Sequence, residues 1–424
     1  MKILIISGEY PPMKGGVGRY TSHLVEALCK KRNLEVHIGL GNFQPRKGIS
    51  PPPSTAQSMS YNNHENCSVS SNNDIDKRRN YHHNIIKKGD RKNSDRLLDL
   101  IQELKPDIVN VQYERGLYEV DTSIFHMSRR IIHGSTLNRF FMKCNVPTIS
   151  TLHTVLPHDE YQEYIRERAL RKEGRFAVLP LQLRAPIRRW VLKRRYELLF
   201  DVVRVSDELI SLAKTIQEIV RRGTVIYHGA EPASSLVSPK NKSEYKKEFG
   251  LPDDKRLLLA FGYIGSYKGF DILDTLKLPD GWSLVVKQNT HERGTEKPVH
   301  FRNNAINLDL GYIDDITLSK IFFACDAIIL PYKVVSVSGV LFDALAHGLP
   351  FIASDLRFFK EFSALDLGIT CNRTKTSFSE SISSLDSDYD RYKKNVQGFS
   401  PTLKWSKVAD NHIELYSKLG SRAV

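Results

Sequence analysis

The sequence predicts an α/β protein of two domains, each built on a parallel sheet. The chain has 424 residues, which exceeds one ordinary hydrophobic core and fits two domains of roughly 200 residues each. Short apolar runs rich in β-branched residues alternate with helix-forming stretches in both halves, a pattern typical of parallel sheets. In each half a glycine-containing loop follows a predicted strand, where such sheets collect ligands.

The first domain is expected to span residues 1–235. Apolar runs predict strands at residues 2–7, 108–112, 148–152, 202–205 and 224–227, with helices at 20–30 and 96–104. Residues 44–93 are rich in Asn, Ser, His and Lys, so they cannot bury enough apolar surface to fold alone. We expect a polar, disordered insertion there. Residues 228–246, with two prolines and several serines, are predicted to be the linker.

The second domain is expected to span residues 236–400. The same reading predicts strands at 257–261, 283–286 and 305–308, a helix from about residue 270 and another at 315–323. A buried strand, a short loop and a helix follow within residues 326–351. Residues 401–424 are predicted to form a closing helix, because its apolar side chains recur at helical spacing. That stripe indicates packing and not chemistry.

The charge of the chain raises three classes of partner. There are 62 Lys and Arg against 48 Asp and Glu, a net charge of +14, which suits nucleic acid, an anionic membrane surface or phosphorylated substrates. The densest basic stretch, residues 166–204, is interleaved with apolar side chains, as in a helix lying on anionic lipid. A solvated helix face explains it as well. Because no zinc-finger, RNP or helix-turn-helix pattern is present, nucleic acid is not expected.

Location and metal content follow from simple patterns. No apolar run reaches the length of a membrane span, and the start MKILIIS reads as a first strand, not a signal peptide. The five cysteines are scattered, without a C-x-x-C pair or clustered histidines. We therefore expect a cytoplasmic protein with neither a disulfide framework nor a metal site.

The segment DAIILPYKVVSVSGVLFDALAHGLPF is the first candidate for a ligand site. Ser338 is a plausible N-cap of the helix, and Gly339 lets a ligand approach the backbone. Gly348 followed by Pro350 ends the helix in the expected order. The exposed N–H groups at such a helix start attract phosphate. Taken alone, the pattern is equally typical of an ordinary strand-to-helix turn.

Two further loops suggest an anion. Gly15 and Gly16 lie in the first loop, but the segment Glu9-Tyr10-Pro11-Pro12 intervenes between them and the strand, so the spacing does not fit a dinucleotide-binding fingerprint. Lys268 lies in the first loop of the second half, where a lysine can place a point charge beside a phosphate. Each loop, taken alone, also fits a simple turn.

Five motifs occurring in order give the chain a family resemblance. EYPPMKGGVGRY, TLHTV, FGYIGSYKGFDIL, LGYIDD and LPYKVVSVSGVLFDALAHGLPFIASD resemble retaining glycosyltransferases of family 4, over the whole chain except the polar insertion. The resemblance implies the GT-B fold, in which two Rossmann-like domains face each other across a cleft and a C-terminal helix crosses back to the first domain. It also implies an acceptor site in the first domain and a nucleotide-sugar site in the second.

The resemblance assigns roles position by position. His153 and Lys268 match residues that contact the transferred sugar and neutralise the diphosphate, and Asp343 matches a carboxylate that serves the nucleotide sugar. The remaining matches are to the glycine loop, the loop that lines the base and the helix start that receives phosphate, namely Gly15, Gly16, Gly311, Tyr312, Ile313, Ser338, Gly339 and Val340. In isolation, His153 is more typical of a hydrogen-bonded histidine at a strand end.

The chain departs from the family pattern at three positions. Val335 stands where the family carries its first glutamate, and Asp343 replaces the second with a shorter acid. Gly265 and Ser266 stand where an arginine commonly precedes the lysine. Two functions therefore stay open, a working glycosyltransferase and a GT-B-like nucleotide-binding or scaffold protein without turnover.

The enzyme implied by the resemblance transfers a hexose, such as mannose or glucose, from a nucleoside diphosphate sugar to a lipid-linked or polysaccharide acceptor. It needs no cofactor or metal, because N–H groups and one cation can balance the charge of the departing diphosphate. Residues 166–204 are then expected to place the first domain on the inner face of the plasma membrane.

Overall fold

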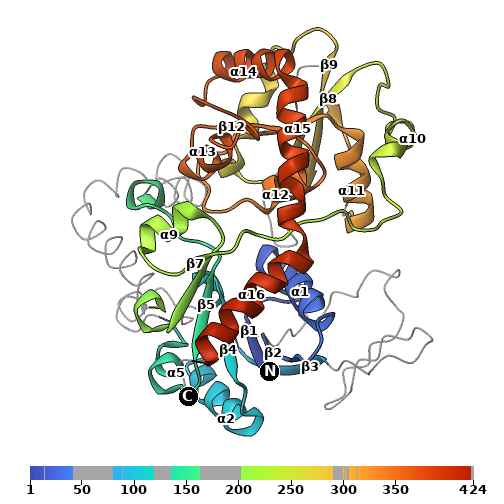
Figure 1. Cartoon of the computed structure of the whole chain (residues 1–424). Helices are drawn as coiled ribbons and strands as arrows, with labels where there is room; N and C mark the ends of the chain where they lie inside the picture. The colour runs from blue at the N-terminus through green and yellow to red at the C-terminus, as the bar shows by residue number, and fades with distance from the viewer. Residues whose placement is uncertain are drawn as a thin grey trace, which may run out of the picture.

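Two parallel sheets form the core of the protein (Figure 1). The computed structural model describes residues 1–13, 15–41, 80–87, 89–118, 135–162, 202–289, 299, 301, 305–311 and 313–421. The basic stretch at residues 166–204 falls almost wholly outside these ranges, so its predicted role stays a prediction.

The first sheet has the strand order β3-β2-β1-β4-β5-β6-β7 within the described residues, with every pairing parallel. Its central strands are buried because helices cover both faces, which explains their continuous apolar runs. The strands are β1 (Lys2–Ser7), β2 (Glu35–Gly41), β3 (Asn80–Ile86), β4 (Ile108–Tyr113), β5 (Thr148–Leu152), β6 (Glu208–Ser211) and β7 (Thr224–Val225).

The helices of the first domain connect these strands. They are α1 (Gly16–Cys29), α2 (Asn93–Leu104), α3 (Arg115–Tyr118), α5 (Asn138–Lys143) and α9 (Lys214–Val220). The strand predicted at residues 202–205 was wrong, because these residues form a helical turn and the strand is β6. Val202 is buried in the helical turn, as it would be in a strand. A short apolar run alone therefore does not distinguish a strand from a buried helical turn.

The C-terminal part of the predicted polar insertion is ordered. Residues 80–86 form β3, which pairs with β2 at the edge of the first sheet, and α2 begins at Asn93. The sequence hides this strand because its side chains are largely polar, as an edge strand allows. Residues 42–79 lie outside the described part of the chain.

The second sheet has the order β10-β9-β8-β11-β12-β13 in the described residues, again with parallel pairings. Its strands are β8 (Arg256–Tyr263), β9 (Trp282–Asn289), β10 (Ile306–Asn307), β11 (Ala327–Leu330), β12 (Phe351–Ser354) and β13 (Gly368–Cys371). Its helices are α10 (Lys242–Glu248), α11 (Asp315–Ala324), α12 (Gly339–Ala346), α13 (Arg357–Ser363), α14 (Lys375–Ser387) and α15 (Tyr389–Phe399).

Four short 3₁₀ segments complete the described elements. They are η4 (Pro239–Asn241), η5 (Ser266–Lys268), η6 (Phe270–Thr275) and η7 (Ser400–Leu403). The helix predicted from about residue 270 is thus the 3₁₀ segment η6. The predicted linker, residues 228–246, includes η4 and most of α10.

The last helix, α16 (Trp405–Gly420), leaves the second domain and crosses the first (Figure 1). Its apolar stripe joins the core beneath α1, where Trp405 and Tyr416 are buried with Ile5 and Leu24. The Asn110 side chain of β4 donates a hydrogen bond of 2.6 Å to the Tyr416 hydroxyl. The predicted closing helix is confirmed as a packing element of the first domain.

Candidate functional site

The N-terminus of α12 has the geometry that the sequence predicts. Ser338 is buried, and its Oγ accepts a hydrogen bond of 3.2 Å from the backbone N–H of Leu341, so it is the N-cap. The helix ends at Ala346, and Gly348, which follows the C-cap His347, has a φ of +75° that suits glycine. One N–H of the first turn is therefore capped, and the others are oriented to attract an anion.

Lys268 lies beside this helix start. Its side chain is 9% exposed, and its Nζ donates a hydrogen bond of 2.6 Å to the hydroxyl of Tyr332. The ammonium also lies 3.9 Å from the centre of the Tyr332 ring. Burial lowers the pKa of Lys268, and in the described chain no carboxylate forms an ion pair with it. A buried cation without an acid partner is a preformed place for an anion.

A close backbone contact brings these two loops together. Gly269 has a φ of +71°, and a Cβ there would overlap the carbonyl oxygen of Pro331. Arg373 ties both loops by donating to the carbonyl oxygens of Pro331 (3.1 Å) and Gly269 (3.4 Å). Only glycine at position 269 permits this approach, which sets the position of Lys268 beside the loop after β11.

His153, at the end of β5, is neutral. Its Nε2 is hydrogen-bonded to Gln112 Oε1 at 3.0 Å, and its ring meets the edge of Tyr20 with centroids 4.9 Å apart. Burial, and to a smaller extent the neighbouring His228, lowers the pKa of His153 to about 3. An uncharged imidazole bound to an amide can orient a polar ligand but does not bind a second proton at neutral pH.

His228 links the first domain to α12, a contact that the sequence did not reveal. Its ring stacks on Phe342 at 5.7 Å, and its Nδ1 donates to the carbonyl oxygen of Gly229 at 2.6 Å. Its Nε2 lies 3.6 Å from the point where a Cβ of Gly339 would stand. Tyr20 touches the rings of both His153 and His228, so these residues connect β5 to the start of α12.

The first glycine loop holds a carboxylate at the start of α1. Glu9 accepts a hydrogen bond of 3.1 Å from the N–H of Gly18, and a Cβ at Gly15 would overlap the Glu9 carboxylate. Gly16, in contrast, faces open space. The glycine at position 15 therefore has a local structural reason, because it admits Glu9 to the helix N-terminus. The described contacts do not bring Gly15 or Gly16 to Lys268 or Ser338.

Asp343 is occupied by a residue of the other domain. Arg19, in the first turn of α1, donates 2.7 Å to Asp343 and 3.2 Å to Asp315, and His23 lies 3.6 Å from Asp315. Asp343 is almost fully buried, and its neighbouring charge raises the pKa of Arg19. No local sequence pattern predicts this interdomain ion pair, because Arg19 and Asp343 are 324 residues apart.

A second contact between the domains joins two of the predicted motifs. The Ser336 hydroxyl donates to the carbonyl oxygen of Val155 and accepts from its N–H, both at 2.9 Å. This pair of hydrogen bonds holds the loop after His153 against the loop before Ser338. The segments TLHTV and VSVSGV, far apart in the chain, therefore meet at the domain junction.

The loop predicted to line the base is held by a buried lysine. Lys287, on β9, donates 2.7 Å to the carbonyl oxygen of Gly311 and 2.8 Å to Asn289. Ile313 packs against the core of the second domain, and Tyr312 lies outside the described residues. Gly311 has a φ of +61° and open space around it. Lys287 thus fixes the backbone of this loop.

The departures from the family pattern have structural counterparts. Val335 is a buried member of the second domain's core, so its side chain faces apolar neighbours. Val340 is half-buried and packs against the same core. Gly265 precedes η5, and its backbone carbonyl accepts a hydrogen bond from the N–H of Lys268 at 2.8 Å.

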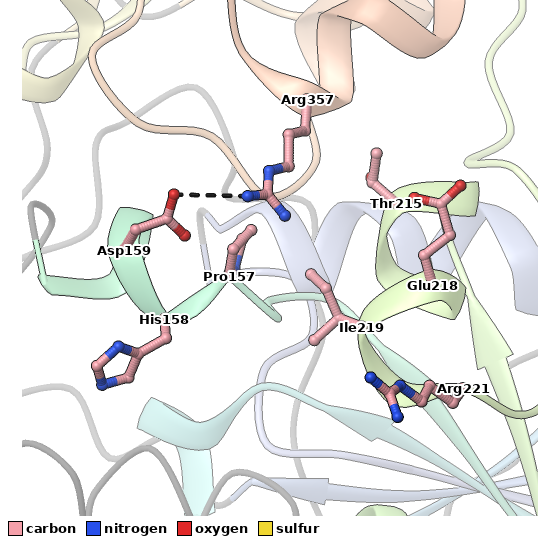
Figure 2. Close-up of a pocket in the computed structure, with 8 residues that line it drawn as sticks. All are labelled: Pro157, His158, Asp159, Thr215, Glu218, Ile219, Arg221 and Arg357. Atoms are coloured by element: carbon pink, nitrogen blue, oxygen red, sulfur yellow. Dashed lines mark ion pairs between the residues drawn. The ribbon is translucent and has the colours of Figure 1, made fainter.

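A cavity of about 300 Å³ opens at another part of the domain junction (Figure 2). Figure 2 shows Arg357 of α13 reaching toward Asp159, to which it is joined by an ion pair of 3.5 Å. The other lining residues are Pro157, His158, Thr215, Glu218, Ile219 and Arg221. None of the site residues predicted from the sequence lines this cavity.

The described residues form neither a metal cluster nor a membrane-spanning helix. No cluster of His, Cys, Asp and Glu in the described ranges has the arrangement of a metal site. No helix in that part of the chain is long and apolar enough to cross a membrane.

Comparison with known sequences gives one distant relative. No protein-family model matches the chain. An uncharacterized glycosyltransferase from Methanocaldococcus jannaschii is 22% identical over 160 residues, which is 36% of this chain and 40% of that protein. The match spans less than half of the relative.

Comparison with solved structures gives matches over nearly the whole chain. Sucrose-phosphate synthase from Thermosynechococcus elongatus has a TM-score of 0.65 and 14% identity, with 99% of both chains covered. Anabaena HepE in complex with UDP-glucose has a TM-score of 0.61 and 13% identity, covering 99% of this chain and all of that one. Together with the two parallel sheets, these matches identify the fold as GT-B, as the sequence predicts.

Proposed function

We propose that the protein is a retaining glycosyltransferase of family 4, which transfers a hexose from a nucleoside diphosphate sugar to a lipid-linked or polysaccharide acceptor. The GT-B fold and the distant relative described as a glycosyltransferase support this proposal. The observation that carries it is the buried Lys268 ammonium, without a carboxylate partner in the described chain, beside the capped start of α12. The structural match that holds UDP-glucose supports a donor of this class.

In this proposal Lys268 and α12 stabilise the leaving group. As the bond to the sugar breaks, the nucleoside diphosphate gains negative charge. The Lys268 ammonium and the free N–H groups at Gly339 and Val340 meet that charge before the reaction begins, so little reorganisation is needed. The acceptor oxygen then attacks the face that the diphosphate leaves, which keeps the configuration of the sugar.

The remaining predicted residues orient the donor. His153 stays neutral with its Nε2–H donated to Gln112, so its Nδ1 accepts a hydrogen bond from a sugar hydroxyl, while Gly311 to Ile313 line the base. Asp343 accepts hydrogen bonds from the nucleotide sugar only after Arg19 has released the Asp343 carboxylate. The proposed transfer needs no metal or cofactor, because the lysine and the helix start supply the positive charge.

The substitution Lys268→Ala tests the role of this cation. Losing the charge is expected to weaken the binding of nucleoside diphosphates and slow transfer, by about 2 to 4 kcal/mol in transition-state stabilisation. Binding is measured by calorimetry and transfer by release of nucleoside diphosphate from a panel of sugar donors. Lys320→Ala is the control, because Lys320 of α11 is engaged in an ion pair with Glu248 of α10. Equal turnover and affinity in Lys268→Ala and the parent would refute the assignment.

A nucleotide-binding scaffold without turnover is the second candidate. Two observations favour it. Arg19 engages the carboxylate of Asp343, and a buried valine stands at position 335, where the family carries a glutamate. Tight binding of a nucleoside diphosphate sugar, with neither hydrolysis nor transfer across acceptors, would support the scaffold. Release of the nucleoside diphosphate in the same assay supports the enzyme.

The membrane role of residues 166–204 is part of the same proposal. A basic, apolar-interleaved segment is expected to hold the first domain on anionic lipid, where a lipid-linked acceptor resides. Flotation with neutral and with anionic vesicles checks this. Equal recovery from both kinds of vesicle would leave the segment as a solvated helix face.

A further inference from the structure

Tyr332 joins the two halves of the candidate phosphate site. The residue follows β11, and its hydroxyl accepts the 2.6 Å hydrogen bond from Lys268 Nζ. Tyr332 also lies in the loop that leads into α12, and its side chain interacts with that of Ser338, the N-cap of this helix. The cation and the helix start are therefore connected through one phenol, in the order Lys268, Tyr332, Ser338.

The ring of Tyr332 is fixed in place. It is 1% exposed and meets the edge of Phe359 with centroids 5.5 Å apart. Its face supports the Lys268 ammonium, 3.9 Å from the ring centre. Because lysine is a flexible four-carbon chain, an immobile hydroxyl and ring face reduce the volume that its ammonium can explore.

An ammonium has three N–H donors, and Tyr332 accepts one of them. The phenol is neutral, since burial raises its pKa far above the physiological range, so it leaves the positive charge of Lys268 uncompensated. A carboxylate in its place would neutralise the lysine and repel a phosphate. A hydroxyl anchors the cation and keeps it available for an anionic ligand.

We propose that Tyr332 is a positioning residue for the diphosphate, holding the Lys268 ammonium in register with the N-terminus of α12 so that both contact the same phosphate group. This inference rests on the proposed function and adds a residue to the donor site. Tyr332 acts through Lys268 and does not itself touch the sugar.

The test compares Tyr332→Phe with Tyr267→Phe. Both substitutions remove one phenol hydroxyl beside Lys268, but the Tyr267 ring lies farther from the ammonium, at 5.4 Å. Calorimetry with UDP, GDP and ADP identifies the tightest nucleoside diphosphate, which is then compared with its parent nucleoside. Tyr332→Phe is expected to weaken the diphosphate about tenfold, the loss for one hydrogen bond to a charged group, and leave nucleoside binding unchanged. Tyr267→Phe should bind both as the parent does.

A second readout separates positioning from a purely structural role. Without the hydroxyl, the ammonium loses a stabilising hydrogen bond, so diphosphate affinity in Tyr332→Phe should begin to fall at a lower pH than in the parent. Unchanged diphosphate affinity would overturn the inference. Equal losses for diphosphate and nucleoside, with a lower unfolding midpoint and no shift in the pH profile, would also overturn it. Absence of nucleoside diphosphate binding in the parent protein would instead refute the proposed function.

Discussion

Lys268 is the residue on which the proposed chemistry depends most. Its ammonium is removed from water by burial, and a phenol and a helix start surround it in place of an acid. Desolvation disfavours the charged form and lowers the pKa of the side chain. A bound diphosphate would reverse this effect, because an adjacent anion favours the protonated lysine. Ligand binding and proton binding at Lys268 are therefore coupled.

We predict that nucleoside diphosphate binding takes up protons at alkaline pH. In the free protein the pKa of Lys268 lies below 10.5, and the ligand raises it, so between the two values binding requires a proton. Affinity should therefore decrease as pH rises through the pKa of the free protein. Calorimetry in buffers of different ionisation enthalpy measures the uptake. The same uptake in Lys268→Met would show that another group is responsible.

The candidate site was predictable at residues that lie in local motifs. Ser338 was recognised because an N-cap leaves a signature within a few positions, and its capping hydrogen bond is present. Arg19, Tyr332 and His228 escaped detection, because their roles depend on contacts with residues distant in the chain. Glu9 was noted only as part of a spacer, although its carboxylate reaches the start of α1.

At the scale of elements, the candidate site depends on one close backbone contact between two loops. The turn at Gly269 and the chain at Pro331 touch through their backbones, and Arg373 bonds to both. The strands β8 and β11 are neighbours in the second sheet, so their carboxyl ends deliver these loops to the same edge. The position of Lys268 is a consequence of that contact between the loops.

We predict that Gly269→Ala is far more harmful than Gly250→Ala. Both glycines have a positive φ, +71° and +63°, so each alanine incurs about 1 to 2 kcal/mol of backbone strain. Only at Gly269 does the new Cβ overlap a backbone atom, whereas the surroundings of Gly250 are open. The free energy of unfolding in urea should fall by several kcal/mol more for Gly269→Ala, which carries both strain and overlap. Equal losses would mean that the loop contact is easily relaxed.

The elements were predictable where burial was strong and continuous. β1 and β5 coincide with the predicted strands at residues 2–7 and 148–152, because fully buried parallel strands read as apolar runs. The edge strand β3 was missed because exposure permits polar residues, and the turn at residues 202–205 was misassigned because four apolar residues carry too little periodicity.

At the scale of the molecule, the two domains are joined by polar contacts as well as by the chain. Arg19 binds Asp343 and Asp315 of the second domain, and Ser336 exchanges two hydrogen bonds with Val155 of the first. The Asp343 carboxylate is nearly inaccessible to water, and Arg19 is the cation that pairs with it. The arrangement holds the domains together at the start of α12.

We predict that Arg19→Met loosens the domains. Removing the guanidinium leaves two acids facing the first domain without their cation, which favours separation. Small-angle scattering of the ligand-free protein should report a larger radius of gyration than for the parent. Arg139→Met is the control, because Arg139 pairs with Asp95 at 2.8 Å inside the first domain. An unchanged radius in Arg19→Met would mean that the remaining contacts suffice.

The path of α16 has a consequence for the order in which the protein is made. The core of the first domain contains β1, near the start of the sequence, and α16, which begins at Trp405. A ribosome must therefore translate the second domain before it reaches the helix that covers the first sheet. Until then an apolar surface around Leu24 and Ile5 stays open, which exposes the nascent chain to aggregation and makes it a substrate for chaperones. The strands of the second sheet, β8 to β13, follow one another in the sequence, so the second domain is free to fold first.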